Sequence, residues 1–213
     1  MIDLRLLIFA RAPVPGATKT RLIPALGADG AARLHAALVR HALTTATAAA
    51  PRALQLWVTG DDPDGLLAAL ASEHGAALHE QSGGDLGARM AHALSAATAD
   101  GVPAIILGSD CPWITASVIR ESAALLGAAD AVLGPADDGG YVLLGLHRVV
   151  ASLFEGVEWG RGNVLEATRE RLGALDWRWR ELPARPDVDR PEDLAALARL
   201  GQPWARLAGV EPS

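Results

Sequence analysis

The chain has 213 residues, half of them hydrophobic, which is enough for one domain with a full core. Its net charge of −6 and the lack of a lysine-rich stripe exclude a general nucleic-acid-binding surface, because phosphate-backbone binding needs a broad basic face. The single cysteine excludes an internal disulfide, and the six scattered histidines have no zinc-ligand spacing.

We expect neither a membrane-spanning segment nor a secretion signal in this sequence. No apolar run approaches the roughly 18–20 residues that a membrane-spanning helix needs. In the first residues, "MIDLRLLIFARAP", Asp3 and Arg5 interrupt a short apolar run that is typical of a buried strand and not of a signal peptide. We therefore expect a cytoplasmic protein with no membrane partner.

Short apolar runs alternate with longer helical patterns along the chain. The runs predict strands at Leu4–Phe9, Leu54–Thr59, Ala76–His79, Ala104–Leu107, Ala131–Leu133 and Tyr141–Gly145. Helices are predicted at Asp29–Ala50, Pro63–His74, Leu86–Ala99 and Thr115–Gly127, with Asp29 and Thr115 as N-caps. A helix near Asn163–Leu172, a strand in "DWRWREL" and a last helix from Pro191 complete the chain.

Strands too apolar to have a wet face, alternating with helices, predict a mostly parallel sheet between two layers of helices. Ligands of such sheets bind at the carboxyl ends of the strands, so the loops that follow the strands are the candidate site.

The loop after the first predicted strand, "FARAPVPGATKTRL" (residues 9–22), is stiff and cationic. Two prolines fix φ and remove backbone donors, and Gly16 allows close approach of a ligand. Arg11, Lys19 and Arg21 supply donors that suit phosphate oxygens. The segment matches neither a Walker A loop nor the Rossmann glycine pattern. The alternative is a rigid surface turn with solvated cations.

The fourth strand is followed by "LGSDCP" (residues 107–112), which carries a lone acid. Asp110 is well placed to hold Mg²⁺ or Mn²⁺, hard cations that share carboxylate and phosphate oxygens. The alternative is that Asp110 caps the next helix, although Thr115 offers a better-positioned cap. We expect Cys111 to be a small buried side chain and not a nucleophile, since no activating histidine is near it in the sequence.

Two acids and two glycines separate the fifth and sixth predicted strands in "GPADDGGYVLLG" (residues 134–145). Asp137 or Asp138 could orient an acceptor hydroxyl or take its proton. The other interpretation is an Asp-Gly hairpin turn between antiparallel strands, and both can hold at once.

Two further stretches have weaker signals. In "QSGGDLGARM" (residues 81–90), Asp85 is placed to cap a helix whose start suits a base, ribose or phosphate. In "PDVDRPEDL" (residues 186–194), helix capping accounts for Asp189 on its own. Trp177 and Trp179 alternate with arginines and predict the apolar face of one strand, packed in the core.

In this order, several segments resemble the glycosyltransferase family associated with arsenosugar biosynthesis, also described as selenium-domain-associated transferases. They are "FARAPVPGATKTRL", "GGDLGARM", "GSDCP", "GPADDGGYVLLGL", "FEGVEWG" and "DVDRPEDL", and they extend from residue 7 to about residue 195. That family is placed in the GT-A-like superfamily of nucleotide-diphospho-sugar transferases. The segments are also similar to small nucleotidyltransferases that activate sugar acids, molybdopterin or phospholactate.

The resemblance implies an α/β fold, a GT-A-like three-layer α/β/α sandwich with a mostly parallel, Rossmann-like central sheet. It implies one domain over residues 1–213, with a nucleotide-binding half at about 1–112 and an acceptor half at about 113–213.

The resemblance also implies roles for matching residues. The nucleotide would contact Arg11, Ala12, Pro13, Gly16, Lys19, Arg21, Gly84 and Asp85. Asp110 and Asp189 would hold Mg²⁺ or Mn²⁺, and the acceptor would meet Asp137, Gly139, Gly140 and Tyr141. Lys19 and Asp138 would be the catalytic pair, with Lys19 on the departing diphosphate and Asp138 at the acceptor hydroxyl.

The resemblance leaves the reaction open at one position. Many GT-A glycosyltransferases carry D-x-D where this chain has Gly108-Ser109-Asp110, and a single Asp is equally at home in nucleotidyltransferases. The first hypothesis is a metal-dependent glycosyltransferase with a nucleotide-sugar donor and a small-molecule acceptor.

The alternative is a nucleotidyltransferase that moves NMP from a nucleoside triphosphate to a phosphorylated small molecule and releases pyrophosphate. A phosphorylated acceptor calls for cations within residues 135–180, where Arg148, Arg161, Arg169 and Arg171 are available. A third hypothesis is a non-catalytic nucleotide-binding module. The sequence leaves a homodimer open.

Overall fold

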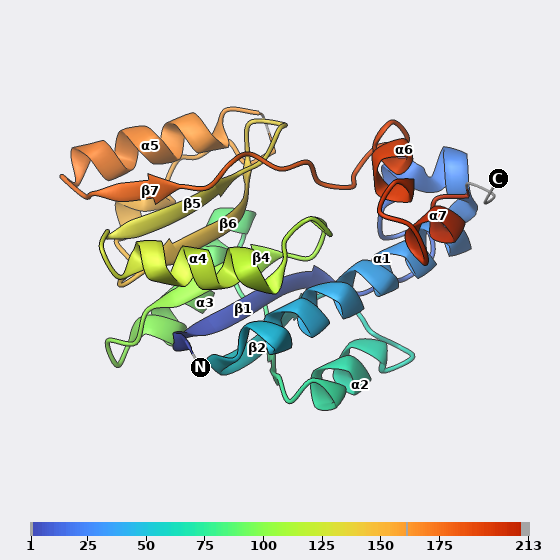
Figure 1. Ribbon diagram of the computed structural model, residues 1–213, viewed down its shortest axis with the longest axis horizontal. Coiled ribbons are helices and arrows are strands. Elements are labelled where there is room, and N and C mark those ends of the chain that lie inside the picture. The colour runs from blue at the N-terminus through green and yellow to red at the C-terminus, as the bar shows by residue number, and fades with distance from the viewer. Residues whose placement is uncertain (1, 161, 210–213) are drawn as a thin grey trace.

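The structure of the protein is a computed structural model that describes residues 2–160 and 162–209. Within these residues the strands form one seven-stranded sheet of order β3-β2-β1-β4-β6-β5-β7 (Figure 1). The strands are β1 (Ile2–Arg11), β2 (Pro51–Thr59), β3 (Ala77–Glu80), β4 (Ala104–Gly108), β5 (Ala131–Pro135), β6 (Tyr141–Leu146) and β7 (Trp179–Glu181). The helices are α1 (Ile23–Ala49), α2 (Leu66–Glu73), α3 (Leu86–Thr98), α4 (Ala116–Leu126), α5 (Val164–Ala174), α6 (Asp193–Ala198) and α7 (Trp204–Leu207), with 3₁₀ turns η1 (Thr20–Leu22) and η2 (Ala151–Leu153).

The sheet is mostly parallel, as the sequence predicts. β1 pairs in parallel with β2 and β4, β2 with β3, and β5 with β7. β6 runs antiparallel to both β4 and β5, because a tight turn joins it directly to β5. A short hairpin can join only antiparallel neighbours, whereas a parallel pair needs a long crossover.

Helices cover both faces of the sheet and give the expected three-layer α/β/α sandwich (Figure 1). On β1, Leu6 and Ile8 pack toward α1, α2 and α4, while Leu7 and Phe9 pack toward α3 and α5. Because both faces of the central strands are buried, their sequences are almost continuously apolar. None of the described helices is long and apolar enough to cross a membrane.

The predicted helix starts need three corrections. α1 begins at Ile23, and a break at Gly27 (φ 69°) lies inside it, so Asp29 is within the helix and is not its cap. α2 begins at Leu66 and not at Pro63. The last predicted helix begins at Asp193 and divides into α6 and α7. The prediction for Thr115 is confirmed, since its side chain accepts a hydrogen bond from Val118 N at the start of α4.

The segment after β7 crosses the molecule and brings the C-terminal helices beside the start of α1 (Figure 1). Val188 is fully buried there with Leu194, Leu197 and Trp204 against Leu22, Leu34 and Leu38. Val188 N also donates to Asp110 O, 2.9 Å away. This packing carries residues 186–190 across to the loops after β1 and β4.

The two tryptophans predicted to share a strand face both pack in the cluster that contains α3 and α5. Trp177 lies just before β7, is buried, and has the guanidinium of Arg148 at 5.2 Å from its ring centroid. Trp179 opens β7 and donates its indole N–H to Glu181. Their role in core packing is therefore confirmed.

Replacing Gly139 with alanine should lower the free energy of unfolding by about 2 kcal/mol or more. Gly139 has φ +85°, and a Cβ there would lie 1.9 Å from the carbonyl oxygen of Gly162. The β5–β6 turn and the loop before α5 therefore cannot keep their contact, which includes the hydrogen bond from Leu165 N to Gly139 O. Urea unfolding measures the effect.

Gly173→Ala is the matched control. Gly173 is helical in α5 and has open space at its Cβ position, so alanine there should raise stability by about 0.5–1 kcal/mol. A Gly139→Ala variant as stable as the wild type would contradict the close contact of the two loops.

Candidate functional site

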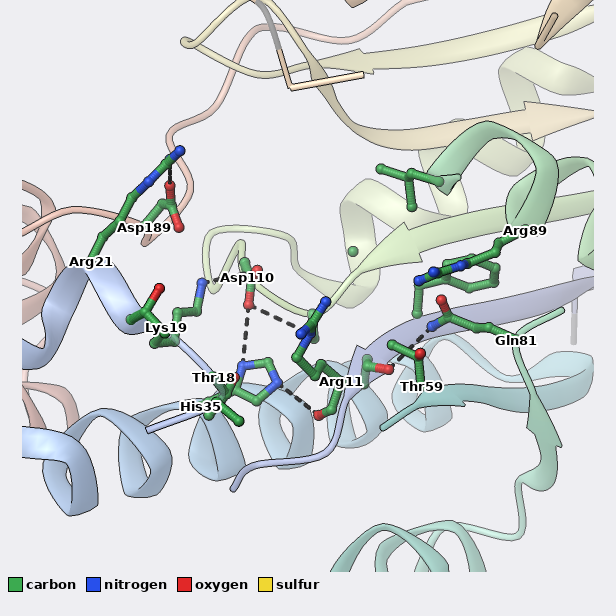
Figure 2. A pocket seen from close by; sticks show the side chains of 17 residues that line it. Arg11, Thr18, Lys19, Arg21, His35, Thr59, Gln81, Arg89, Asp110 and Asp189 are labelled. Carbon is green, nitrogen blue, oxygen red and sulfur yellow. Dashed lines mark hydrogen bonds and ion pairs between the residues drawn. The ribbon is translucent and has the colours of Figure 1, made fainter. Parts of the chain in front are cut away.

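A cleft of about 710 Å³ opens at the carboxyl ends of β1, β2 and β4, and we call it the first cleft (Figure 2). Its polar lining is Arg11, Thr18, Lys19, Thr20, Arg21, His35, Thr59, Gln81, Arg89, Ser109, Asp110 and Asp189. The sheet explains the location, since backbone groups at the strand ends are free to face a ligand there. The volume falls within the range of small-molecule and cofactor sites.

Lys19 lines the first cleft and is the only lysine in the sequence. Its side chain is 4% exposed, and its Nζ lies 2.9 Å from Asp110 Oδ2 and donates to the carbonyl of Val188. Its backbone adopts the left-handed region with φ 47°, which is uncommon for a residue other than glycine. Lys19 thereby joins the loop after β1 to the loop after β4 and to the crossing C-terminal segment.

His35 of α1 is a second partner of Asp110 that the sequence reasoning missed. It is buried, its Nδ1 lies 3.5 Å from Asp110 Oδ1, and its Nε2 lies 3.0 Å from the carbonyl of Arg11 (Figure 2). Because a carbonyl oxygen only accepts, Nε2 is the protonated nitrogen of this contact. The available signal was a polar residue beside Leu34 on the buried side of the predicted helix.

These partners fix the charge of Asp110. Burial opposes ionisation of its carboxyl, but the charge of Lys19 and the neighbouring imidazole of His35 outweigh it and hold the pKa of Asp110 well below its ordinary value. Asp110 is therefore a carboxylate at neutral pH, and it does not cap α4.

Asp189 is paired with the guanidinium of Arg21 at the rim of the first cleft (Figure 2). The capping role that its sequence position suggested is wrong. Asp193, the first residue of α6, instead fixes the turn before the helix, since its Oδ2 accepts hydrogen bonds from Asp189 N at 2.9 Å and Arg190 N at 2.7 Å. The Asp189 side chain is thus left to face the cleft.

The first cleft has more positive than negative side chains, although the protein as a whole is acidic. Lys19 and Arg21 are paired with Asp110 and Asp189, whereas Arg11 and Arg89 have no carboxylate partner among residues 2–160 and 162–209. The Arg89 Nε donates to the carbonyl of Gly83. This balance suits an anionic ligand with several oxygens.

Not every residue expected to contact a nucleotide lines the first cleft. Ala12 is buried, and its N donates to Thr59 O, so it fixes the loop. Asp85 caps α3 by accepting from Ala88 N at 2.8 Å. Five of the residues expected to contact the nucleotide do not line the first cleft, namely Ala12, Pro13, Gly16, Gly84 and Asp85.

The start of α3 contributes Leu86 and Arg89 to the wall of the first cleft, in place of the expected Gly84 and Asp85. Gln81 is also there and is fixed by hydrogen bonds from its Nε2 to the carbonyls of Ala10 and Trp57.

Two smaller hollows adjoin the first cleft. The acidic cleft, about 520 Å³, is lined by Arg21, Asp137, Asp138, Gly160, Gly162, Pro186, Asp187, Asp189, Arg190 and Asp193. The apolar cavity, about 190 Å³, is lined by Leu86, Met90, Ala136, Asp138, Gly140, Tyr141, Val142, Trp159, Gly160, Gly162, Val164 and Asp187. Shared wall residues connect all three hollows.

The β5–β6 turn brings the expected acceptor residues to these two hollows. Asp137 and Asp138 line the acidic cleft, and Asp138, Gly140 and Tyr141 line the apolar cavity. Gly139 lines neither and packs on Gly162 instead. The hairpin interpretation is confirmed, with Asp138 Oδ1 accepting from Gly140 N at 2.9 Å.

Asp187 is a further site residue that the sequence reasoning missed. Burial first, and then the negative charges of Asp138 and Asp110, raise its pKa to about 6, against the opposing charge of Lys19. The available signal in the sequence was the pattern Asp187-Val188-Asp189, in which two acids flank a residue that is buried. Asp187 lies in the wall shared by the apolar cavity and the acidic cleft, where burial and the neighbouring carboxylates act on it together.

The described carboxylates fit a metal that is shared with a phosphate ligand better than a metal held by protein ligands alone. Asp110 and Asp189 line the same cleft, but no group of three or more His, Cys, Asp or Glu that could hold a metal occurs in the part of the chain that the structure describes. Mg²⁺ is often held by one or two carboxylates together with substrate phosphates, whereas a structural site needs a full protein cage. The residues therefore fit a metal shared with a phosphate ligand.

The arginines considered for a phosphorylated acceptor lie elsewhere. Arg148 packs on Trp177, Arg169 pairs with Glu166 and Glu181, and Arg171 donates to backbone carbonyls. None of these three lines the first cleft, the acidic cleft or the apolar cavity. Arg161 lies outside the described residues.

Cys111 should react with iodoacetamide at pH 8 at least about 100-fold more slowly than a free thiol. The side chain is buried, and burial raises the pKa of its thiol to about 11, so little thiolate forms. Mass spectrometry of the native protein measures the rate, and the urea-unfolded chain is the control that should react at the ordinary rate. Rapid alkylation of the folded protein would contradict the burial of Cys111.

Comparison with protein families gives a match over residues 38–161 to the family described as "Uncharacterized protein conserved in bacteria (DUF2064)". The chain belongs to the DUF2064 family. The matched residues include the loop after β4 and the β5–β6 hairpin of this DUF2064 chain, but not Lys19 or Asp189. No curated protein matches its sequence.

Solved structures extend the likeness over the whole chain. A candidate nucleotide-diphospho-sugar transferase from Desulfovibrio desulfuricans G20 is 31% identical, with a TM-score of 0.86 over 98% of the DUF2064 chain and 94% of its own length. A cytidylyltransferase from Leptospira borgpetersenii is 15% identical, with a TM-score of 0.59 over 98% and 93%. The Mycobacterium tuberculosis protein Rv0371c, in complex with manganese, is 17% identical, with a TM-score of 0.54 over 92% and 98%. The last two share only the fold.

Proposed function

We propose that this protein is a metal-dependent glycosyltransferase that uses a nucleotide-sugar donor and a small-molecule acceptor. The observation that carries the proposal is the Lys19–Asp110 pair in the wall of a cationic cleft that adjoins an acidic cleft and an apolar cavity. We assign the cationic cleft to a donor half at about residues 1–112 and the other two hollows to an acceptor half at about residues 113–213 of a single domain. The Desulfovibrio relative's description as a nucleotide-diphospho-sugar transferase supports it.

In this proposal the first cleft binds the diphosphate. Arg11, Lys19 and Arg21 supply donors to its oxygens, and charge-assisted hydrogen bonds of this kind are about twice as strong as neutral ones. Asp110 and Asp189 would hold Mg²⁺ or Mn²⁺, which supplies Lewis-acid stabilisation of the departing diphosphate. Lys19 stabilises the same developing charge from the protein side. The manganese bound to Rv0371c supports a divalent metal in this fold.

At the other side of the site, Asp138 accepts a hydrogen bond from the acceptor hydroxyl. Its Oδ1 is oriented by Gly140 N, so the carboxylate has a fixed direction at the wall of both smaller hollows. Within the DUF2064 family, the six quoted segments support a place near the transferases associated with arsenosugar biosynthesis.

Nucleotidyl transfer is the second candidate function, and the residues before Asp110 favour it. Gly108 and Ser109 replace the first carboxylate of a D-x-D motif, so Asp189 has to be the second ligand. Against it, the three described arginines that could serve a phosphorylated acceptor make contacts elsewhere.

A panel of nucleotide sugars and nucleoside triphosphates, each with Mg²⁺ or Mn²⁺, distinguishes the functions. A bound ligand raises the melting temperature by mass action. A rise with one nucleotide sugar, followed by release of its nucleoside diphosphate, would support glycosyl transfer. A rise with a triphosphate alone and release of pyrophosphate would replace it with nucleotidyl transfer. Binding without turnover of any acceptor would favour a non-catalytic module.

A further inference from the structure

The apolar cavity has the composition of a binding site and not of a water-filled gap. Its walls come from the start of α3, the β5–β6 hairpin, the loop before α5 with the first residue of that helix, and the segment after β7. Six of the lining side chains are large and apolar or aromatic, namely Leu86, Met90, Tyr141, Val142, Trp159 and Val164. Concave sites for small molecules combine such walls with a few placed polar groups.

The indole of Trp159 is held in place before any ligand arrives. A Cβ on Gly87 would lie 2.4–2.5 Å from the indole, so Trp159 packs directly on the backbone of α3. Tyr141 meets the ring edge-on at 6.4 Å between centroids, and Phe154 stacks at 6.5 Å. A fixed aromatic wall binds an apolar face with little loss of side-chain entropy.

The charged side chains of the apolar cavity are both acids. Asp138 and Asp187 line both the apolar cavity and the acidic cleft, and no cation among the described residues lines the apolar cavity. The acidic cleft has five lining aspartates against two arginines, Arg21 and Arg190, and Arg21 is paired with Asp189. Carboxylates accept hydrogen bonds from hydroxyls but repel phosphate and carboxylate groups.

We propose that the apolar cavity takes the acceptor of the transfer, and that this acceptor is an alcohol with an apolar face and without a phosphate or carboxylate group. The inference rests on the proposed glycosyl transfer and adds the chemical class of its second substrate. The apolar face lies against Trp159, and the hydroxyl donates to Asp138.

The transfer step balances with these groups. The acceptor oxygen forms a bond to the anomeric carbon of the donor sugar. The bond from that carbon to the diphosphate oxygen breaks, and its electron pair stays on the diphosphate in the first cleft. The hydroxyl proton passes to Asp138 and from there to solvent.

Three small probes separate the features of the proposed acceptor. Benzyl alcohol has an apolar face and a hydroxyl, benzyl phosphate has the face and a phosphate, and glycerol has hydroxyls without the face. Saturation-transfer NMR measures their binding to the full chain, with and without a nucleoside diphosphate and Mg²⁺. We expect benzyl alcohol to bind about tenfold or more tightly than either of the others.

Two tryptophan variants locate the binding. Trp159→Ala should weaken benzyl alcohol by about tenfold. Trp179→Ala, which removes the same atoms from a wall of the core outside all three hollows, should leave the affinity unchanged. If Trp159→Ala does not fold, Val164→Phe replaces it, because the larger ring fills the cavity and should give the same loss.

Equal or tighter binding of benzyl phosphate would overturn the inference. An affinity for benzyl alcohol that is unchanged in Trp159→Ala, or in Val164→Phe where that variant replaces it, would also overturn it. Absence of benzyl alcohol binding would overturn it too, and would leave the proposed function standing if the nucleoside diphosphate binds. Failure of the diphosphate to bind would instead overturn the proposed function, while the probe measurements without nucleotide still decide the character of the cavity.

Discussion

Replacing Asp110 with asparagine should abolish the rise in melting temperature that Mn²⁺ and a nucleotide produce together, and should lower any transfer rate by about 100-fold or more. Asparagine keeps the shape of the side chain but removes the negative charge that a divalent metal needs. Asp110 lines the first cleft from the end of β4, and Asp189 alone leaves a single carboxylate there. Differential scanning fluorimetry and a transfer assay measure the two effects.

Asp100→Asn is the matched control for this substitution. Like Asp110, Asp100 is ion-paired, in its case with Arg5 at 2.6 Å, but it lines none of the three hollows. The control should lose no response to metal and nucleotide. If Asp110→Asn keeps a wild-type response while Asp100→Asn behaves normally, Asp110 is not a metal ligand.

Without ligand, the difference in free energy of unfolding between the wild type and Asp110→Asn should depend on pH. Since the folded state lowers the pKa of Asp110, its ionised form stabilises the wild type above the unfolded pKa of about 4 and this contribution disappears as pH falls further. The wild type should therefore be more stable than the variant at pH 7, and the difference should shrink below about pH 4.

Replacing Lys19 with methionine should weaken nucleoside diphosphate binding by about 10–100-fold and lower the free energy of unfolding by about 1–3 kcal/mol. The substitution leaves the Asp110 carboxylate without its closest cation and the Val188 carbonyl without its donor. Both losses fall where the crossing C-terminal segment is fixed to the loops of the sheet. Isothermal titration calorimetry and urea unfolding measure them.

Lys19→Arg should restore neither the diphosphate affinity nor the free energy of unfolding. The Lys19 side chain is 4% exposed, and the planar guanidinium of arginine is too wide for the space that its ammonium group occupies. Arg52→Met is the control, since Arg52 makes an exposed ion pair with Asp3 and should change stability by less than about 1 kcal/mol. Wild-type diphosphate affinity in Lys19→Met would show that the first cleft binds phosphates without Lys19.

The sequence by itself determined the layers of the fold. Residues of β1 such as Leu6 and Leu7 are apolar on both faces, and that pattern is stable only between two layers of helices. The alternation of strands and helices then placed the loops after β1 and β4 at one edge of the sheet, so Lys19 and Asp110 could be expected together. The Asp-Gly turn was readable as well, because its geometry depends on local residues.

Only the tertiary structure decided which carboxylates face which hollow. Asp189 had a sufficient local explanation as a helix cap, but its side chain pairs with Arg21 from the loop after β1 instead. Asp187 and His35 became site residues through burial of Val188 and through the approach of α1 to the loop after β4. Trp159 became a cavity wall because Gly87, far away in sequence, leaves room for its ring. Such contacts join residues distant in the chain, and local patterns of hydrophobicity hold no information about which distant partner will arrive.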